Sequence, residues 1–336
     1  MCDHHRTPRL VVTLIITAGL SVVVAMSCSD QRIVEPDCEG CFRFYVDFPN
    51  SSTQTVLRDV FFVDSVNGWV VGHDGLILHS ADGGATWSTQ RQVPGAKFWG
   101  VHFLNASTGW IISENGVLTR TSDGGSTWND RRIGSYALTS VFILDQWRGW
   151  TVGADIILRT NNFGTSWQVY DDIDTVLSTL YGVTFPDSSK GWAVGSGDHK
   201  ILHTDDGGDH WYPQSNPSTQ PLLDVAFADA SHGWAVGVGA TIVHTANGGA
   251  TWTEQAIGTD RVLHGVDFWD INTGVVVGDL GVVFTTTDAG DTWEQHLTGN
   301  NNDLMKVSYI DANSFCACGY NGTLLLITRR WEECCE

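Results

Sequence analysis

Carboxylates that could act as general acids or bases recur in this chain, always at one place in a repeated box. The box reads S/T-x-D/N-x-G-x-T/S/H-W and lies at 80–87, 121–128, 160–167, 204–211, 245–252 and 286–293. Acid–base catalysis needs two carboxylates that converge on one bond. One carboxylate in each repeat instead indicates a turn, in which the Asp side chain accepts hydrogen bonds from backbone N–H groups and the Gly adopts a positive φ. The Trp of the box packs between the repeats. We therefore assign a structural role to Asp82, Trp87, Asp123, Trp128, Asn162, Trp167, Asp206, Trp211, Asn247, Trp252, Asp288 and Trp293.

Imidazoles that could bind a metal also follow the repeat. His79, His203 and His244 share one slot with Arg120 and Arg159, and nothing in the spacing makes the imidazoles converge. Tryptophans in recurring G-W pairs could suggest a sugar-binding stack, but one per repeat at a fixed position is typical of a core. We expect packing between repeats, with no metal and no cofactor.

Cysteines gather near the two ends of the chain. Cys2 and Cys28 lie at the N-terminus, and the other six lie outside the first six repeats. In an exported protein an even number of cysteines predicts disulfides that join the two ends, although the sequence does not choose the pairing. The alternative is a zinc site made by Cys38, Cys41, Cys334 and Cys335. The disulfide candidates are Cys38, Cys41, Cys316, Cys318, Cys334 and Cys335.

These residues must be positioned by a unit that occurs seven times. Its first anchor recurs as Val60, Val101, Val141, Val183, Val225, Val266 and Val307, at intervals of 40 to 42 residues. Alternating apolar runs separated by Gly and Asx turns predict four short antiparallel strands per unit, at about 57–63, 68–72, 76–80 and 86–92 in the first. Seven such sheets around an axis form an all-β, seven-bladed β-propeller.

Closure of the ring requires a fourth strand for the last blade, because the seventh box is missing. The segment 41–48, CFRFYVDF, is strand-like and lies before the first unit, so we expect it to dock beside 323–328. The alternative is a shortened local fourth strand that contains Trp331. The predicted domains are a signal peptide over 1–27, a short tether over 28–40 and one propeller over 41–336.

One slot of the repeat varies in residue type and could carry a binding function. In an up-and-down blade, the boxes and the turns between the first and second strands lie on one face of the propeller. The loops that vary between units lie on the opposite face, together with the second residue of the L-x-x-V-x-F pattern, and we expect them to surround the entrance of the central channel. This slot and the next supply the candidate binding residues Arg58, Asp59, Trp99, Tyr181, Asp224, His264 and Lys306. The alternative is a solvated funnel with no ligand. We assign no catalytic residue.

The N-terminus has the pattern of an export signal. Residues 1–9 carry two arginines, and the seventeen residues at 10–26 carry no charge. Ala25-Met26-Ser27-Cys28 is similar to a lipobox, which predicts cleavage and a lipid on Cys28. Ordinary cleavage and free secretion are the alternative. Both predict export, to the cell envelope as a periplasm-facing or surface lipoprotein in the first case.

Charge restricts the partners of this chain. It has 38 acidic and 18 basic residues, a net charge of −20 and a pI near 4.7, which argues against nucleic acid and anionic membranes as ligands. We expect a monomer that binds an envelope or membrane protein or peptide. It would contact the membrane only through the lipid anchor.

The complete array, G-W-x-V-G followed by I-L-x-T-x-D-G-G-x-T-W, resembles the photosystem II stability and assembly factor family of seven-bladed propellers with Asp-box (bacterial neuraminidase) repeats. The resemblance covers about 57–331. It implies a non-catalytic scaffold that binds a reaction-centre precursor through a basic patch. This chain departs from that pattern, because its net charge is −20 and it has four lysines.

A glycan-directed hydrolase or carbohydrate-binding propeller of the sialidase type is the alternative function. It would need three converging arginines, a Tyr paired with Glu, and an acid/base Asp. The blades are nearly minimal in length, which leaves no long loops to build a deep pocket. We therefore favour a scaffold over an enzyme.

Overall fold

The computed structural model describes residues 41–170, 179–197 and 200–332, which form seven four-stranded sheets. Blade 1 consists of β2 (Leu57–Phe62), β3 (Gly68–Gly72), β4 (Ile77–Ser80) and β5 (Ser88–Arg91). Blade 2 consists of β6 (Phe98–Asn105), β7 (Thr108–Ser113), β8 (Val117–Thr121) and β9 (Asn129–Arg132). Blade 3 consists of β10 (Leu138–Ile143), β11 (Gly149–Gly153), β12 (Ile156–Thr160) and β13 (Gln168–Val169). Blade 4 consists of β14 (Leu180–Thr184), β15 (Gly191–Gly195), β16 (Ile201–Thr204) and β17 (Tyr212–Pro213).

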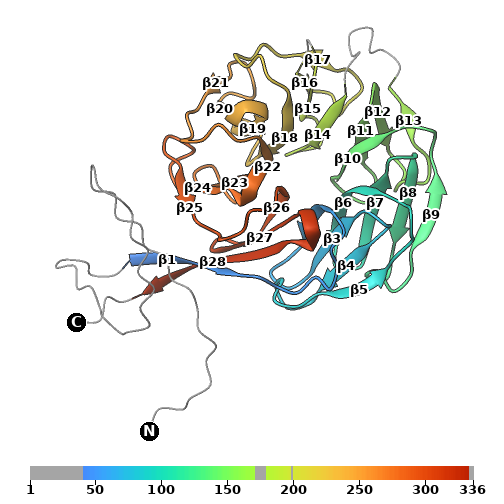
Figure 1. The fold of residues 1–336 in the computed structure, drawn as a ribbon. Coiled ribbons are helices and arrows are strands. Elements are labelled where there is room, and N and C mark those ends of the chain that lie inside the picture. The colour runs from blue at the N-terminus through green and yellow to red at the C-terminus, as the bar shows by residue number, and fades with distance from the viewer. Residues whose placement is uncertain (1–40, 171–178, 198–199, 333–336) are drawn as a thin grey trace, which may run out of the picture. The chain divides into compact units, whose positions relative to one another are not determined.

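Blades 5 to 7 complete the ring (Figure 1). Blade 5 consists of β18 (Leu222–Phe227), β19 (Gly233–Gly237), β20 (Ile242–Thr245) and β21 (Thr253–Glu254). Blade 6 consists of β22 (Leu263–Phe268), β23 (Gly274–Gly278), β24 (Val283–Thr286) and β25 (Glu294–His296). Blade 7 consists of β26 (Leu304–Asp311), β27 (Ser314–Gly319), β28 (Leu324–Glu332) and β1 (Cys41–Asp47). Short 3-10 turns lie at η1 (Val238–Ala240), η2 (Asp279–Gly281) and η3 (Tyr320–Gly322), and the described residues include no helix long and apolar enough to cross a bilayer.

The predicted seven-bladed propeller is confirmed. The four strands of blade 1 agree with the predicted ranges within about two residues at each end, since alternation and turn residues both mark them. The first strands of successive blades contact one another, so they are the innermost strands (Figure 1). The compact unit that contains the ring spans Arg43–Arg330.

The two faces of the ring follow from the up-and-down order of the strands. On one face, Gly83 of a box donates its N–H to the carbonyl of Val66 in the first turn, at 3.0 Å. On the other, Gly75 between the second and third strands donates to Ala96 at 2.8 Å. We call them the box face and the entrance face.

An N-terminal strand completes blade 7, as expected. β1 lies beside β28, and Phe44 and Val46 pack against the buried cluster that blades 6 and 7 share. The chain then follows the last blade, where the Ser51 hydroxyl donates to the Gly322 carbonyl at 2.6 Å. Trp331 belongs to β28, the third strand of the blade, which contradicts the alternative of a local fourth strand.

The boxes form closed turns on the surface. In the first, Asp82 accepts the backbone N–H of Thr86 at 2.9 Å, while the Ser80 hydroxyl accepts the N–H of Gly84 at 2.8 Å. The hydroxyl and N–H of Thr86 hold the pKa of Asp82 below its usual value. Asp123 and Asp288 accept the same bonds from threonines, and Asn162 and Asn247 take this place in two other boxes. These aspartates are therefore engaged in turn geometry.

Face-to-face aromatic stacks join four pairs of successive blades. Trp150 in the second strand of blade 3 stacks on Phe185 of blade 4, with centroids 3.5 Å apart and planes 10° apart. The edge of the same Phe185 meets Trp211 of its own box at 5.7 Å and 89°. Gly191 must be glycine, because a Cβ there would lie 2.3 Å from the Phe185 ring. The same face-to-face stack joins Trp69 with Phe103, Trp192 with Phe227 and Trp234 with Phe268.

The histidine slot packs on the tryptophan of its own blade, because the two residues face each other on paired strands, and not between repeats as expected. His203 lies 4.6 Å from Trp192 and His244 lies 4.8 Å from Trp234, in stacked geometry. Burial lowers the pKa of both imidazoles, so they remain neutral near pH 7. Among the described residues, no group of three or more His, Cys, Asp or Glu side chains is arranged to hold a metal ion.

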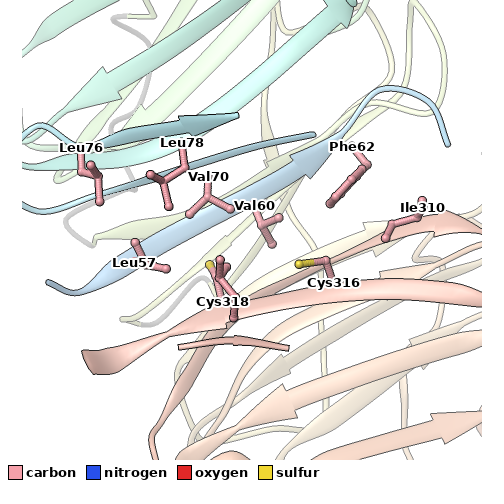
Figure 2. Packing of buried hydrophobic residues seen from close by; sticks show 10 residues of the cluster. Leu57, Val60, Phe62, Val70, Leu76, Leu78, Ile310, Cys316 and Cys318 are labelled. Atoms are coloured by element: carbon pink, nitrogen blue, oxygen red, sulfur yellow. The ribbon is translucent and has the colours of Figure 1, made fainter. Parts of the chain in front are cut away.

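Cys316 and Cys318 are free, buried thiols, which contradicts their assignment as disulfide candidates. Both project from β27 toward Leu57 and Val60 of β2 (Figure 2), so alternation along the strand directs them into the core between blades 7 and 1. Burial raises the pKa of Cys316 to about 12, which keeps it protonated and unreactive. Cys38, Cys334, Cys335, Cys28, the signal peptide and the tether lie outside the described residues.

We expect Trp150→Ala to lower the free energy of unfolding by about 3–5 kcal/mol, because it removes a fully buried ring and one inter-blade stack. Urea unfolding followed by circular dichroism measures this change. The matched control is Trp147→Ala, since Trp147 is 58% exposed and its loss should change stability by no more than about 0.5 kcal/mol. Equal losses in the two variants would contradict a role for the stack in joining the blades.

Candidate binding site at the channel entrance

A one-residue shift in strand register occurs near the start of every innermost strand. In blade 1 it lies between Leu57 and Asp59, and the corresponding shift occurs in the other six blades. Such a bulge opposes two residues to one, which frees the residue in the second slot from the regular alternation of the strand. The residues in this slot are all partly exposed: Arg58, Trp99, Thr139, Tyr181, Leu223, His264 and Met305.

Two of the predicted binding residues meet where blades 7, 1 and 2 adjoin. The guanidinium carbon of Arg58 lies 4.4 Å from the Trp99 ring centroid and 5.7 Å from that of Tyr320. Arg58 Nε donates to His73 Nε2 at 3.2 Å. Burial, Arg58 and Lys97 lower the pKa of His73, which keeps its imidazole neutral and able to accept. We call Arg58, His73, Trp99 and Tyr320 the Arg58 cluster.

The other predicted aromatic residues of the entrance lie on separate blades. His264 of blade 6 is paired with Asp279, with 2.7 Å between Nε2 and Oδ1. Tyr181 of blade 4 is partly exposed and belongs to none of the ring contacts of the Arg58 cluster. The structure therefore joins Arg58 with Trp99 and leaves Tyr181 and His264 as separate groups on the entrance.

Three further predicted residues form part of a charged cluster on the axis. Lys306 Nζ of blade 7 lies 2.6 Å from Asp224 Oδ1 of blade 5, and Asp59 and Asp267 complete what we call the axial cluster. Blade 6 carries Gly265 in this slot, where a Cβ would lie 3.0 Å from the Lys306 Cα. Since Asp224 is 3% exposed and held by Lys306, its carboxylate is not a free ligand group at the entrance.

The axial carboxylates also tie blade to blade. An innermost strand has one edge with no neighbouring strand of its own sheet, and buried backbone N–H groups need acceptors. Each axial Asp supplies a carboxylate oxygen as the acceptor for a backbone N–H group of the following blade. The donors and acceptors are Val101 N–H to Asp59 at 2.8 Å, Val266 N–H to Asp224 at 2.9 Å and Tyr309 N–H to Asp267 at 2.8 Å. At the closing junction Ser308 Oγ accepts the Phe62 N–H at 3.1 Å.

The axial cluster carries more carboxylates than cations, and burial makes their charge costly. Burial raises the pKa of Asp59 to about 7 and that of Asp267 to about 6, although Lys306 and the backbone N–H bonds act in the opposite direction. Burial alone would lower the pKa of Lys306, but Asp224 and Asp59 raise it above its usual value. Lys306 therefore stays charged while the protonation of Asp59 and Asp267 changes near neutral pH.

Sequence analysis did not identify Asp267, His102 or Tyr320. Asp267 and His102 occupy the fifth position of their units, two residues after the slot that holds Asp59, so the period of a strand could have placed them on the axis. His102 lies 4.3 Å from the Phe61 ring and 4.7 Å from Phe142. Tyr320 reaches Arg58 only through closure of the ring, which no local pattern indicates.

We expect Asp59→Asn to become more stabilising, relative to wild type, as the pH rises from 5 to 8. The pKa of Asp59 is about 7 in the folded state and near 3.8 when unfolded, so its favourable contribution is complete below pH 3.8 and is lost as the pH rises through 7. Asn keeps an acceptor for Val101 and cannot ionise. The difference in unfolding free energy, variant minus wild type, should increase by about 3 kcal/mol over this range.

Urea unfolding at several pH values measures this difference, and Asp82→Asn is the matched control. Asp82 has a lowered pKa, so it is ionised in both states between pH 5 and 8 and its substitution should give a pH-independent loss of stability. A pH-independent difference for Asp59→Asn would show that the axial carboxylate ionises normally.

The family described as photosynthesis system II assembly factor YCF48 matches residues 46–99, 90–177 and 214–301. No curated protein matches the sequence significantly.

Solved structures share the fold at low identity. One described as YCF48 bound to a D1 peptide is 20% identical, with a TM-score of 0.70 over 85% of this chain and 94% of that chain. YCF48 from Cyanidioschyzon merolae is 22% identical, with a TM-score of 0.70 over 84% and 98%. A streptogramin B lyase is 12% identical, with a TM-score of 0.74 over 85% and 98%. Because the matches to the family model cover more than half of the chain, this protein belongs to the photosynthesis system II assembly factor YCF48 family.

Proposed function

We propose that this protein is an exported, lipid-anchored scaffold that binds a peptide segment of an envelope or membrane protein at the entrance face. The observation that carries the proposal is the Arg58 cluster, where a cationic group lies between aromatic rings and forms no ion pair among the described residues. Family membership supports a role in assembly, and a structural neighbour is described as YCF48 bound to a D1 peptide. The scaffold itself performs no chemical step in this proposal.

The distribution of variable residues supports the entrance face as the binding surface. On the box face, the carboxylates of Asp82, Asp123 and Asp288 accept hydrogen bonds from backbone N–H groups of their own turns. On the entrance face, the second slot of the innermost strand carries a different residue type on every blade while the bulge that holds it stays the same. A constant framework with variable residues at one end is typical of binding sites on repeat folds.

Export and anchoring rest on the N-terminal sequence. The uncharged segment 10–26 ends at Ser27 and Cys28, which suits cleavage before Cys28 and lipid attachment to its thiol. A lipid on Cys28 would hold the propeller near membrane proteins. The membrane contact would then need no charged surface on the propeller, in agreement with the net charge of −20.

We expect affinity capture of the full chain from its own envelope extract to enrich a protein partner that Trp99→Ala/Tyr181→Ala/His264→Ala loses. The three substitutions shorten side chains on the entrance while the core residues remain. Trp147→Ala, an exposed Trp in a turn on the box face, is the control and should retain the partner. Mass spectrometry identifies the captured proteins.

Retention of the same partner by the triple variant would place binding elsewhere on the molecule. Enrichment of no protein, together with binding or cleavage of envelope glycans, would overturn the scaffold proposal in favour of a glycan-directed protein.

We expect Cys28→Ser to abolish incorporation of labelled fatty acid and to release the protein from the membrane fraction. The thiol is the only group at this position that can form the thioether of a bacterial lipoprotein. Cys2→Ser, within the segment that cleavage removes, is the control and should leave both properties unchanged. Labelling that persists in Cys28→Ser would overturn the anchor.

A further inference from the structure

We propose that Arg58 is a receptor for a carboxylate group of the peptide ligand. This inference rests on the proposed function and names the chemical group that the entrance recognises. Its ligand is either the C-terminal α-carboxylate of a peptide or an Asp or Glu side chain within it.

Neighbouring side chains fix the orientation of the Arg58 guanidinium. The Trp99 ring at 4.4 Å and the Tyr320 ring at 5.7 Å flank it, and its Nε–H is donated to His73 at 3.2 Å. A guanidinium has five N–H donors, and this arrangement uses one. The four on the two terminal nitrogens have no hydrogen-bond acceptor among the described residues, so they remain available as a pair of parallel donors.

Several other arginines of this chain are neutralised by neighbouring carboxylates. Arg91 pairs with Asp130 at 2.6 Å, and Arg148 pairs with Asp145 at 2.5 Å. Arg58 forms no ion pair among the described residues, although the chain has 38 acidic and 18 basic residues. Since a guanidinium fork matches a carboxylate in two parallel hydrogen bonds, a carboxylate from another molecule is the complementary ligand.

Two carboxylates that are adjacent in sequence to residues of the Arg58 cluster form hydrogen bonds of their own. Asp59 follows Arg58 directly, but its oxygens accept the backbone N–H groups of Val60 and Val101, both at distances below 3.0 Å. Asp74 follows His73 and accepts from Thr55 Oγ1 at 3.4 Å and from the Gly95 N–H at 3.3 Å. Among the described residues, neither of these two carboxylates pairs with Arg58, which leaves the cation for an external partner.

Aromatic flanks also define what accompanies the carboxylate. Tyr320 is 37% exposed and Trp99 is partly exposed, so apolar ring surface lies beside the cation. Rings stacked on a guanidinium stabilise its charge and exclude water, which strengthens an incoming ion pair. A carboxylate with adjoining apolar atoms, as in a peptide, fits this surface better than an inorganic anion.

The test is a nuclear magnetic resonance titration of the ¹⁵N-labelled mature protein with sodium acetate, against sodium chloride at equal ionic strength. Acetate should shift the Arg58 Nε–H and Trp99 Nε1–H signals saturably, whereas chloride should not. The signal of Arg91, which is already paired with Asp130, is the internal control and should not move. In Arg58→Gln the response of Trp99 should disappear, and Arg58→Lys should weaken acetate binding at least about tenfold because it lacks the fork.

Three forms of one decapeptide then separate the sources of the carboxylate. The first has a free C-terminus and no acidic side chain, the second is its C-terminal amide, and the third is the amide with one internal Asp. Stronger binding of the first than of the second indicates an α-carboxylate, and stronger binding of the third than of the second indicates a side chain. Equal binding of all three, or identical shifts with acetate and chloride, overturns the inference.

Failure of this inference is distinguishable from failure of the proposed function. If Arg58→Gln keeps the captured partner that Trp99→Ala/Tyr181→Ala/His264→Ala loses, the scaffold stands and the carboxylate receptor is wrong. If acetate titrates Arg58 but no protein partner is captured, the receptor chemistry stands and the scaffold proposal is wrong.

Discussion

The structure depends on the face-to-face stack between a tryptophan of one blade and the ring of the next. A four-stranded blade cannot bury both of its faces alone, so its stability comes from its neighbours. Trp150 on Phe185 shows how this is achieved, since the same Phe is also held at its edge by Trp211. A glycine at the start of the second strand leaves room for the ring, as Gly191 does for Phe185 and Gly274 does for Phe268. The glycine and tryptophan of the G-W motif therefore serve packing between blades at the junctions where this stack occurs.

Near the axis a second constraint acts, because the innermost strands present N–H groups that no sheet neighbour accepts. Asp59, Asp224 and Asp267 accept these N–H groups from the following blade, and Lys306 offsets part of their charge. Burying them is costly, which raises the pKa of Asp59 and Asp267. The third residue of the L-x-x-V-x-F pattern therefore has a structural role on several blades. The second slot, released by the bulge, remains free to vary.

The candidate site follows from this division between committed and variable positions. Arg58 and Trp99 come from the variable slot of adjacent blades, while His73 and Tyr320 come from loops of the same face. Membership of the YCF48 family agrees with a binding role for such a surface. In a strongly acidic chain, Arg58 places a cationic group beside the Trp99 and Tyr320 rings on this face.

Local patterns in the sequence were sufficient to predict the number of blades, the strands, the box turns and the closing strand. The strand pattern recurs seven times at intervals of 40 to 42 residues, and the box recurs six times. The same pattern placed Arg58 and Trp99 in one slot. The three-dimensional structure was needed to show that Tyr320 reaches Arg58, that Lys306 pairs with Asp224, and that Cys316 and Cys318 are core thiols instead of disulfide partners. These contacts join residues from different blades, so they depend on ring closure and on how deep each strand carries its side chains, which no local pattern encodes.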